Sequence, residues 1–394
     1  MHRTAPLLAA VFAAAVTAQG PLATGSKDLV WSNTTGQGSP ILYTRVLYPS
    51  PSGGVNAPVL PRAGGWPVIV FLHGYGRLGR DYADLGHFWA SHGFAVVQVD
   101  SSMWSYFGLV LDGIAYHGAI TQANATPGNF FAGAFDTQRM ALAGRSMGGG
   151  ATAMILAQNP GYRCGYAIAP AWPGATYTSL VREPVGVVVG AGDQVTPANL
   201  HATPYFQSLA PDTGLKFYYQ FDATFDHMNL VGLTESSPQA LLRTADIGLG
   251  FFENFLAIDA GGLERCLGPR SVNDTRVVAF DCAVAEPMLW AEARPRIGRS
   301  TRISLAAEFG PGGILAAPSL GTTMPTAFGL FRLDASSTYV WTTGLVAAAN
   351  RLDMTLTVPA DPTLVGATLA LQALGGATQQ PLLLGSAAML RIGQ

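Results

Sequence analysis

Apolar runs of strand length alternate with segments of helical periodicity through the middle of the chain. The strand-like runs occupy residues 67–72, 94–100, 139–144, 164–170, 184–191 and 215–221, and the helical segments include 82–93, 106–124 and 149–158. Strands that alternate with helices in this way predict a mostly parallel sheet covered by helices, an α/β fold. An amphipathic segment at 237–259 predicts a helix packed on the sheet, and two strand-like pieces between residues 19 and 65 predict edge strands.

The hydrophobic pattern changes after Cys282. From about residue 288 onward, short strand-like runs lie between Gly, Pro and Asp turns, with no helical period. This pattern predicts a small antiparallel β-sandwich. The segment 288–394 contains no His and no Cys, so we expect a stability or spacer module there, with binding to a surface as the alternative. The expected division is a leader at 1–18, an α/β domain at 19–285 and the β-sandwich accessory domain at 288–394.

The first twenty residues have the pattern of an export signal. One Arg is followed by an apolar stretch from about Ala5 to Val16 and by the small-residue ending Val16-Thr17-Ala18. This segment predicts cleavage after Ala18 and a secreted protein, extracellular or periplasmic. It is too short for a stable membrane anchor. The formal net charge is −2 with no basic stripe, so nucleic acid is not an expected partner, and the pattern identifies no protein partner.

Three cysteines fit an oxidising compartment. Cys266 and Cys282 enclose fifteen residues. A disulfide between them would stabilise the fold by ~3 kcal/mol in the loop-entropy account. Cys164 lies in a strand-like run, and we expect it to be a buried thiol.

The segment between the run 139–144 and the following helix carries a candidate for chemistry. Gly144-Arg145-Ser146-Met147-Gly148 is a G-x-S-x-G pattern in a strand, turn and helix context. A serine in such a turn adopts a strained backbone, flanking glycines avoid clashes, and the hydroxyl is presented as a nucleophile. The backbone N–H of Met147 lies at the start of the helix, where positive partial charge favours an oxyanion. The alternative is a glycine-rich turn with no catalytic role.

Candidates for the base and the acid follow the serine in the chain. Only His201 and His227 come after Ser146. Asp193 stands just past the run 184–191, at the carboxyl end of a predicted parallel strand, where open α/β sheets build their sites. His201 is only eight residues further on, in a predicted helix, so His227 is the better candidate for the base.

Other roles are open for these residues. Asp193 could cap a helix, and His227 could be an ordinary surface histidine. Asp222 and Asp226 are rival acids in the loop of His227 itself. The order Ser, Asp, His along the chain is that of an α/β-hydrolase triad, which favours Ser146, Asp193 and His227.

A loop that precedes Ser146 in the chain is the candidate source of a second N–H donor for an oxyanion. The run 67–72 ends in His73-Gly74-Tyr75-Gly76. In this fold the loop after an early strand supplies a second N–H donor, and we assign that role to the backbone N–H of Tyr75. We expect the ring of His73 to hold the loop by hydrogen bonds.

These segments together resemble the secreted polyesterase, lipase and cutinase group of α/β-hydrolases, which includes the bacterial cutinases and poly(ethylene terephthalate) hydrolases. The likeness covers about residues 25–282 and rests on "HGYG", "DTQRMALAGRSMGGGAT", "GAGDQVTPANLHATPYFQSL" and "CLGPRSVNDTRVVAFDC". It implies an α/β-hydrolase fold with Ser146 as nucleophile, His227 as base and Asp193 as its orienting acid.

The resemblance also implies roles around the triad. Tyr75 and Met147 would supply the oxyanion donors. Tyr75 and Trp172 would flank an open groove for an aromatic or aliphatic acyl unit. The disulfide between Cys266 and Cys282 would close the domain after its last helix.

Some positions depart from the group. Arg145 stands where its members usually have His or Trp, which makes this cation a candidate for substrate binding or raises the cost of protonating His227. One extra residue, Ala171, precedes Trp172 and could displace its side chain. The bulky segment 101–108 could reshape one wall, and the sandwich has no counterpart in ordinary cutinases.

The sequence thus predicts a secreted serine carboxylesterase that needs no metal and no organic cofactor, with an ester or polyester as substrate and residues 19–285 as catalytic domain. A lipase or phospholipid acetylhydrolase with the same triad, a catalytically silent surface-binding scaffold, and an exported peptidase are the alternatives.

Overall fold

The structure is a computed structural model that describes part of the chain. The described residues are 20–158, 161–234, 238–256, 261–307, 310–327, 329–346, 351–376 and 383–394. The leader expected at residues 1–18 lies outside them.

A ten-stranded sheet organises the larger part of the molecule. Its strands are β1 (Thr24–Ser32), β2 (Ile41–Pro49), β3 (Gly54–Val55), β4 (Trp66–Leu72), β5 (Ala95–Val99), β6 (Phe135–Arg145), β7 (Gly165–Ile168), β8 (Val185–Gly190), β9 (Leu215–Phe221) and β10 (Val277–Val284). Their order across the sheet is β10-β9-β8-β7-β6-β4-β5-β2-β1-β3. Strands β4 to β9 pair in parallel, and so do β1 and β3. The pairings β1-β2, β2-β5 and β9-β10 are antiparallel.

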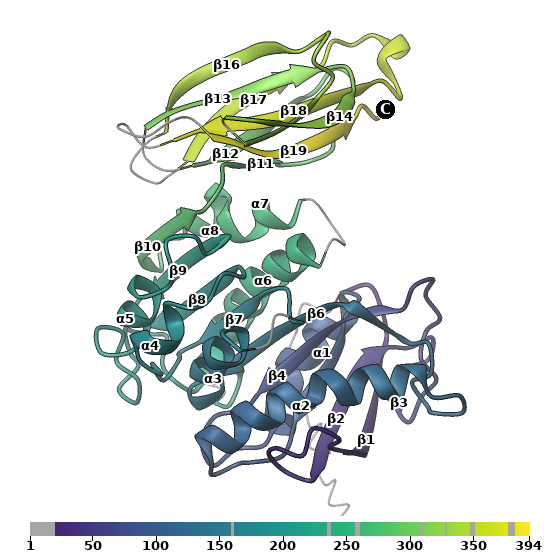
Figure 1. The fold of residues 1–394 in the computed structure, drawn as a ribbon, viewed down its shortest axis with the longest axis vertical. Helices are drawn as coiled ribbons and strands as arrows, with labels where there is room; N and C mark the ends of the chain where they lie inside the picture. Colours follow the sequence, from purple (N-terminus) through teal and green to yellow (C-terminus); the bar gives the residue numbers. More distant parts are fainter. Residues whose placement is uncertain are drawn as a thin grey trace, which may run out of the picture.

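Helices follow the parallel strands and cover the sheet (Figure 1). They are α1 (Ala83–Ser91), α2 (Tyr106–Ala125), α3 (Met147–Leu156), α4 (Ala175–Thr178), α5 (Ala202–Gln207), α6 (Pro238–Phe255), α7 (Gly262–Leu267) and α8 (Pro269–Val272), with the short 3-10 turns η1 (Gly79–Tyr82) and η2 (Asn229–Val231). The mixed arrangement, with a mostly parallel sheet between helices, fits an α/β-hydrolase. Among the described helices, none combines the length and apolar composition that a membrane span needs.

The core lies on both faces of the sheet, as the pattern of β4 illustrates. Val68, Val70 and Leu72 belong to a cluster that includes buried side chains of α2, α3 and α5. Ile69 and Phe71, which alternate with them, belong to the opposite cluster with α1 and α6. Because both faces of a parallel strand are buried, such strands read as continuous apolar runs in the sequence.

The C-terminal strands form smaller sheets. They are β11 (Met288–Ala291), β12 (Ser300–Ala306), β13 (Gly310–Ala317), β14 (Leu320–Thr326), β15 (Gly329–Leu333), β16 (Tyr339–Val346), β17 (Arg351–Thr357), β18 (Thr368–Gly375) and β19 (Leu383–Arg391). The sheets have the orders β11-β12-β17, β16-β13-β18-β19 and β14-β15, and every pairing is antiparallel. One apolar cluster joins the first two sheets through residues such as Ile303 and Leu305 on one and Ile314 and Leu371 on the other.

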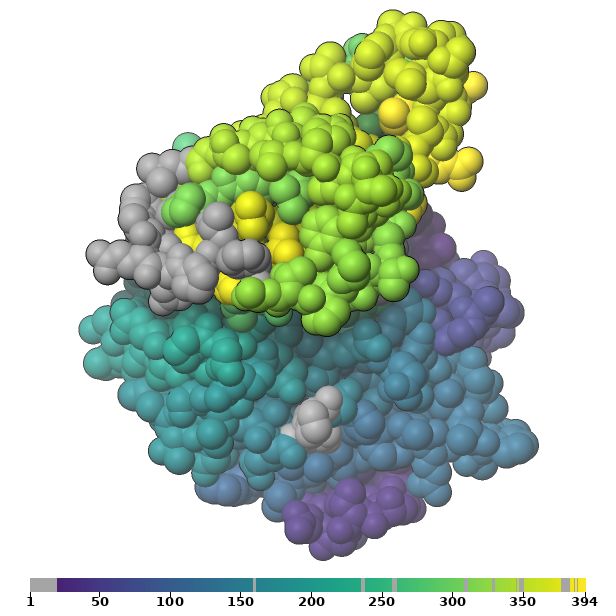
Figure 2. All heavy atoms as spheres, turned by 45° about the horizontal axis from the view of Figure 1, so that its top comes forward, coloured from purple at the N-terminus to yellow at the C-terminus, as the bar shows by residue number. Residues whose placement is uncertain are grey.

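These C-terminal strands gather at the end of the molecule that carries α7 and β10, opposite β1 to β3 (Figure 1). In the space-filling view their yellow-green and yellow atoms form a group of their own beside the teal and blue atoms of the ten-stranded sheet (Figure 2).

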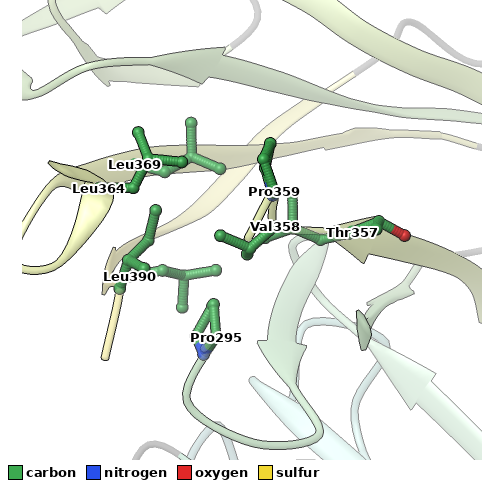
Figure 3. A pocket seen from close by; sticks show the side chains of 9 residues that line it. Pro295, Thr357, Val358, Pro359, Leu364, Leu369 and Leu390 are labelled. Carbon is green, nitrogen blue, oxygen red and sulfur yellow. The ribbon is translucent and has the colours of Figure 1, made fainter. Parts of the chain in front are cut away.

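An apolar cavity of about 90 Å³ lies within the C-terminal sheets. Side chains from β17, β18 and β19 converge on it, together with side chains from the segments that follow β17 and β19 and from the segment before β12 (Figure 3). The lining residues are Pro295, Leu356, Thr357, Val358, Pro359, Leu364, Leu369, Leu390 and Ile392. This lining offers no acid, base or thiol, so we assign the cavity no chemistry.

A polar junction attaches the C-terminal strands to α7. The carboxylate of Glu264 accepts a hydrogen bond from Trp290 Nε1 at 3.0 Å and forms an ion pair with Arg302. Arg351 donates to the carbonyl of Leu267 at 2.8 Å, at the end of the same helix. Trp290 is itself buried in the apolar cluster of α6 and α7. One carboxylate of α7 therefore receives two donors from the strands that follow.

No bond joins Cys266 and Cys282 in the structure, where both side chains are buried, so the expected disulfide is not shown. Cys266 lies in α7 and its Sγ donates to the carbonyl of Leu263 at 3.7 Å. Burial raises the pKa of the Cys266 thiol well above its usual value and raises the pKa of Cys282 to about 12. Because the thiolate is the species that reacts, such burial leaves both groups unreactive. Cys164 is a buried thiol as well.

The junction at Glu264 generates a stability prediction. We expect Glu264→Gln to lower the free energy of unfolding by about 2 kcal/mol, because the variant removes the charge from a carboxylate that holds two donors. The matched control is Glu292→Gln, whose 45% exposed side chain lies 3.8 Å from the same Arg302. Urea denaturation should separate the two variants. Equal stabilities would contradict a role for Glu264 in the junction.

Candidate active site

Ser146 occupies a sharp turn between β6 and α3. The strand ends at Arg145, the helix begins at Met147, and the serine between them has φ 58° and ψ −118°. A positive φ in a residue with a side chain is a strained backbone conformation. The turn matches the strand, turn and helix geometry that the G-x-S-x-G pattern predicts.

The glycines on either side of Ser146 are required by close backbone contacts. A Cβ atom on Gly144 would lie 2.3 Å from the carbonyl oxygen of Gly148. A Cβ atom on Gly148 would lie 2.1 Å from the carbonyl oxygen of Leu72 at the end of β4. Helix α3 can therefore begin directly against β4 only because these positions lack side chains.

The side chains of Ser146, His227 and Asp193 form a hydrogen-bonded series. The hydroxyl of Ser146 lies 3.1 Å from His227 Nε2, and His227 Nδ1 lies 2.6 Å from Asp193 Oδ2. All three residues are buried. With a proton on Nδ1 donated to the carboxylate, Nε2 is free to accept the serine proton, which is the arrangement of a nucleophile, a base and an orienting acid.

The two oxygens of Asp193 have separate tasks. Oδ1 accepts the backbone N–H groups of Val195 and Thr196 at 2.9 and 2.8 Å, and so caps the turn after β8. Oδ2 accepts from His227 and from the hydroxyl of Thr196 at 2.9 Å. Asp193 thus caps a turn with one oxygen and faces His227 with the other, whereas the N-cap of the next helix, α5, is His201.

Thr196 is a residue of this site that the sequence analysis did not identify. Its Oγ1 lies 3.1 Å from His227 Nδ1 and 3.0 Å from the carbonyl oxygen of Ala169. The hydroxyl therefore contacts the acid, the base and the turn after β7 together. A threonine three residues after the candidate aspartate, in a predicted Asx turn, is the signal that could have indicated it.

The rival acids and the second histidine have other partners. Asp222 Oδ1 accepts from both the backbone and the side chain of Thr224. Asp226 Oδ1 accepts from the backbone N–H groups of Met228 and Asn229, at the start of η2. Both carboxylates therefore shape the loop that carries His227. His201 accepts the backbone N–H of Trp172 on its Nδ1 at 3.2 Å.

Burial and the neighbouring charges set the protonation of the pair. Burial lowers the pKa of His227 and the charge of Arg145 lowers it further. Together they outweigh the hydrogen bond that His227 donates to Asp193 and the charges of Asp193 and Asp226, which raise this pKa. Burial raises the pKa of Asp193, but the bonds from His227 and Thr196 more than offset this and leave the pKa below its usual value. Near neutral pH the imidazole is therefore neutral and the carboxylate charged, as a general base and its orienting acid require.

Two backbone N–H groups near Ser146 make no hydrogen bond within the described residues. These are the N–H of Tyr75, in the loop after β4, and the N–H of Met147, the first residue of α3. The loop lies against the serine, because a Cβ atom on Gly74 would be 3.3 Å from Ser146 Cβ. The ring nitrogens of His73 face the carbonyl oxygens of Gly74 and Ser101, at 2.9 and 2.8 Å, and so hold the loop. An oxyanion could accept from both N–H groups.

Arg145 has a different partner from the one expected. It is only 4% exposed, and its Nε and Nη2 atoms donate to the carbonyl oxygen of His227 at 3.1 and 2.7 Å. The guanidinium is thus engaged by the protein, and the expectation that Arg145 binds substrate is corrected.

Exposed aromatic side chains surround the loops of the site. Tyr75 is 63% exposed and Trp104 is 65% exposed, and their rings meet edge to face with centroids 5.2 Å apart. Trp172 is also partly exposed, and the backbone N–H of the inserted Ala171 donates to the carbonyl of Ser146 at 2.8 Å. The insertion is therefore hydrogen-bonded to the nucleophile's own backbone.

The position of Trp104 depends on contacts from distant segments. Gly76, with φ 68°, approaches the indole so closely that a Cβ atom there would lie 2.8 Å from it. The buried carboxyl of Asp112 accepts from the hydroxyls of Ser102 at 2.6 Å and Ser39 at 2.9 Å. This carboxyl ties the segment of Trp104 to α2 and to the N-terminal strands.

The contacts of Thr196 generate a prediction. We expect Thr196→Val to lower kcat for the ester hydrolysis expected from the sequence by about ten-fold, because Asp193 and His227 lose one neutral hydrogen bond while the volume is kept. Thr196→Ser, which retains the hydroxyl, should stay within about two-fold of the wild type. Steady-state kinetics on a soluble ester measures both. Equal rates for the valine and serine variants would exclude a role for the hydroxyl.

This chain is similar in sequence to several known hydrolases. Cutinase 1 of Thermobifida cellulosilytica is 28% identical over 164 residues, which are 39% of this chain and 58% of that protein. A cutinase of Thermobifida fusca is 28% identical over 164 residues, 39% of this chain and 50% of that protein. Bis(hydroxyethyl) terephthalate hydrolase of Streptomyces coelicolor is 24% identical over 250 residues, 61% of this chain and 68% of that protein.

The chain spans about half or slightly more of the length of the curated cutinases it matches. A family model described as PET hydrolase-like matches residues 9–235, which is more than half of the chain and contains the serine, the aspartate and the histidine of the site. The chain therefore belongs to the PET hydrolase-like family.

Proposed function

We propose that this protein is a serine carboxylesterase that hydrolyses ester bonds through an acyl-enzyme and acts on polyesters or their soluble fragments. The observation that carries the proposal is the hydrogen-bonded series from Ser146 through His227 to Asp193. The strained turn at Ser146 and the two open N–H groups beside it support the same reaction.

The proposed reaction uses only groups of this chain and water. His227 Nε2 takes the proton of Ser146 as the serine oxygen attacks the ester carbonyl, and the N–H groups of Tyr75 and Met147 bind the resulting oxyanion. The intermediate collapses, the alcohol leaves with the proton from His227, and the acyl group remains on Ser146. Water then attacks the acyl-enzyme with His227 again as base, which releases the acid and restores the serine.

The proposed substrate has an aromatic or aliphatic acyl unit. Exposed apolar side chains that gather in one place can mark a binding site, and Tyr75, Trp104 and Trp172 lie on the loops next to the serine. Rings of this kind bind flat or extended apolar groups by stacking and edge contacts. The similarity to cutinases and to a bis(hydroxyethyl) terephthalate hydrolase supports an ester of this class.

We further propose a division of the chain that follows its sheets. Residues 19–285 would form the catalytic domain, and residues 288–394 a β-sandwich that serves as an accessory module held on α7 by Glu264. Export would follow from the leader-like pattern at residues 1–18.

The nucleophile is tested by Ser146→Ala. We expect the variant to lose at least about 10³-fold in turnover of a short p-nitrophenyl ester, because no other group can form the acyl-enzyme. The matched control is Ser179→Ala, an exposed serine after α4, which should retain wild-type activity. Near-normal activity of Ser146→Ala would refute the assignment. A sharp rise in rate on emulsified triglyceride, beyond the rate on short esters, would point to the lipase alternative.

The aromatic pair is tested by Trp104→Ala. We expect kcat/KM for an aromatic diester such as bis(hydroxyethyl) terephthalate to fall by up to about ten-fold, and kcat/KM for p-nitrophenyl acetate to change little, because only the larger acyl group reaches the ring. Tyr339→Ala removes an aromatic side chain of similar exposure from β16 and serves as the control. An equal loss on both substrates would show that Trp104 does not select the acyl group.

A further inference from the structure

Arg145 is a buried cation without a carboxylate partner. Its side chain is 4% exposed, and no Asp or Glu among the described residues forms an ion pair with it. Burying a charge without a counterion is costly, and burial accordingly lowers the pKa of Arg145. The cost of burying this charge, directly before Ser146, indicates that Arg145 has a role that a neutral side chain would not fill.

One side of the guanidinium holds the loop that carries the base. Nε and Nη2 both donate to the carbonyl oxygen of His227, at 3.1 and 2.7 Å, and Nη2 also lies 2.9 Å from the sulfur of Met228. Two donors on one carbonyl fix the backbone of His227 directly, because the carbonyl belongs to the same residue as the imidazole.

The other side of the guanidinium meets the loop of the oxyanion donor. A Cβ atom on Gly74 would lie 2.8 Å from Arg145 Nη1 and 3.2 Å from the hydroxyl of Tyr82. That hydroxyl accepts the backbone N–H of Gly74 at 3.1 Å, and it favours the charged form of Arg145. Arg145 and Tyr82 therefore sit together against the residue that precedes Tyr75.

We propose that Arg145 is a positioning residue that couples the His227 loop to the Tyr75 loop, so that the base and the oxyanion donor are held in one fixed geometry around Ser146. The proposal rests on the proposed esterase function, because the distance between base and oxyanion donor matters only for an acyl transfer. It assigns Arg145 no contact with the substrate.

The charge of Arg145 adds a second effect on the base. The charged groups that act on His227 are Asp193 and Asp226, which raise its pKa, and Arg145, which lowers it. Arg77 in turn acts on Arg145. A buried cation close to the imidazole disfavours the imidazolium, so His227 stays available as a base at lower pH than it would without Arg145.

The test compares variants that separate the charge of Arg145 from its hydrogen bonds to the carbonyl of His227. Arg145→Met removes both. We expect its kcat/KM on a soluble p-nitrophenyl ester to fall about 10-fold to 100-fold. We also expect the acid limb of its pH profile to move to higher pH by about one unit. Arg145→Lys keeps the charge but cannot fork onto the carbonyl, so kcat should fall while the acid limb stays in place. Tyr82→Phe removes only the hydroxyl that bonds Gly74, and it should lower kcat with an unchanged acid limb and KM.

The control and a second readout keep the outcomes distinct. Arg163→Met is the matched control, because exposed Arg163 binds the carbonyl of Gln138 at the opposite, amino-terminal edge of the parallel strands. NMR titration of the His227 ring in wild type and Arg145 variants measures the imidazole pKa without any substrate. A wild type without esterase activity would refute the proposed function, whereas the titration would still test Arg145.

Two results would overturn the inference. Unchanged kcat in both Arg145→Lys and Tyr82→Phe would show that the two loops are held without this link. A loss of activity in Arg145→Met that is matched by an equal loss of stability in urea denaturation, with the wild-type titration of His227, would show that Arg145 only supports the fold. If the methionine variant does not fold, the lysine and phenylalanine variants decide.

Discussion

The backbone strain at Ser146 is the constraint on which the rest of the site depends. A side-chain residue at positive φ costs about 1–3 kcal/mol and persists only where its surroundings determine it. Here the N–H of Ser146 donates to the carbonyl of Ile168, and its own carbonyl accepts from Ala171, so β7 and the loop after it hold the turn from one side. The contact of Gly148 with the end of β4 holds it from the other. Contacts from the neighbouring parallel strands therefore offset the backbone strain of the turn that exposes the hydroxyl of Ser146.

Around this turn, the buried polar side chains each contact more than one group. Asp193 caps its own loop and orients the imidazole, Thr196 contacts both of them, and Arg145 bonds the backbone of the residue whose ring it influences. Such sharing satisfies buried donors and acceptors with few side chains. It also means that a change at one of these positions disturbs several loops together, so that single substitutions report on the network rather than on one bond.

Much of the α/β part could be predicted from sequence, because buried parallel strands are continuous apolar runs and the order of Ser146, Asp193 and His227 is constrained by the fold. Contacts made only by tertiary packing, such as those of Thr196 and of Arg145, leave no periodic signal. The individual C-terminal strands are harder to place, because segments such as "GPGGILAA" of β13 are rich in Gly, Pro and Ala, which disfavour strands. The spacing of Cys266 and Cys282 indicates the length of the loop between them and not their oxidation state.

The hydrogen bonds of Asp112 have a consequence for how this protein could be altered. Its carboxyl joins Ser39, from the N-terminal strands, to Ser102, next to the exposed Trp104. Three segments that are far apart in the chain thus define one wall. Grafting residues 101–108 alone onto a relative would carry the indole but not its support, so the smallest transplantable unit includes the loop before β2 and the first half of α2. We therefore expect the three segments of this wall to change together in evolution.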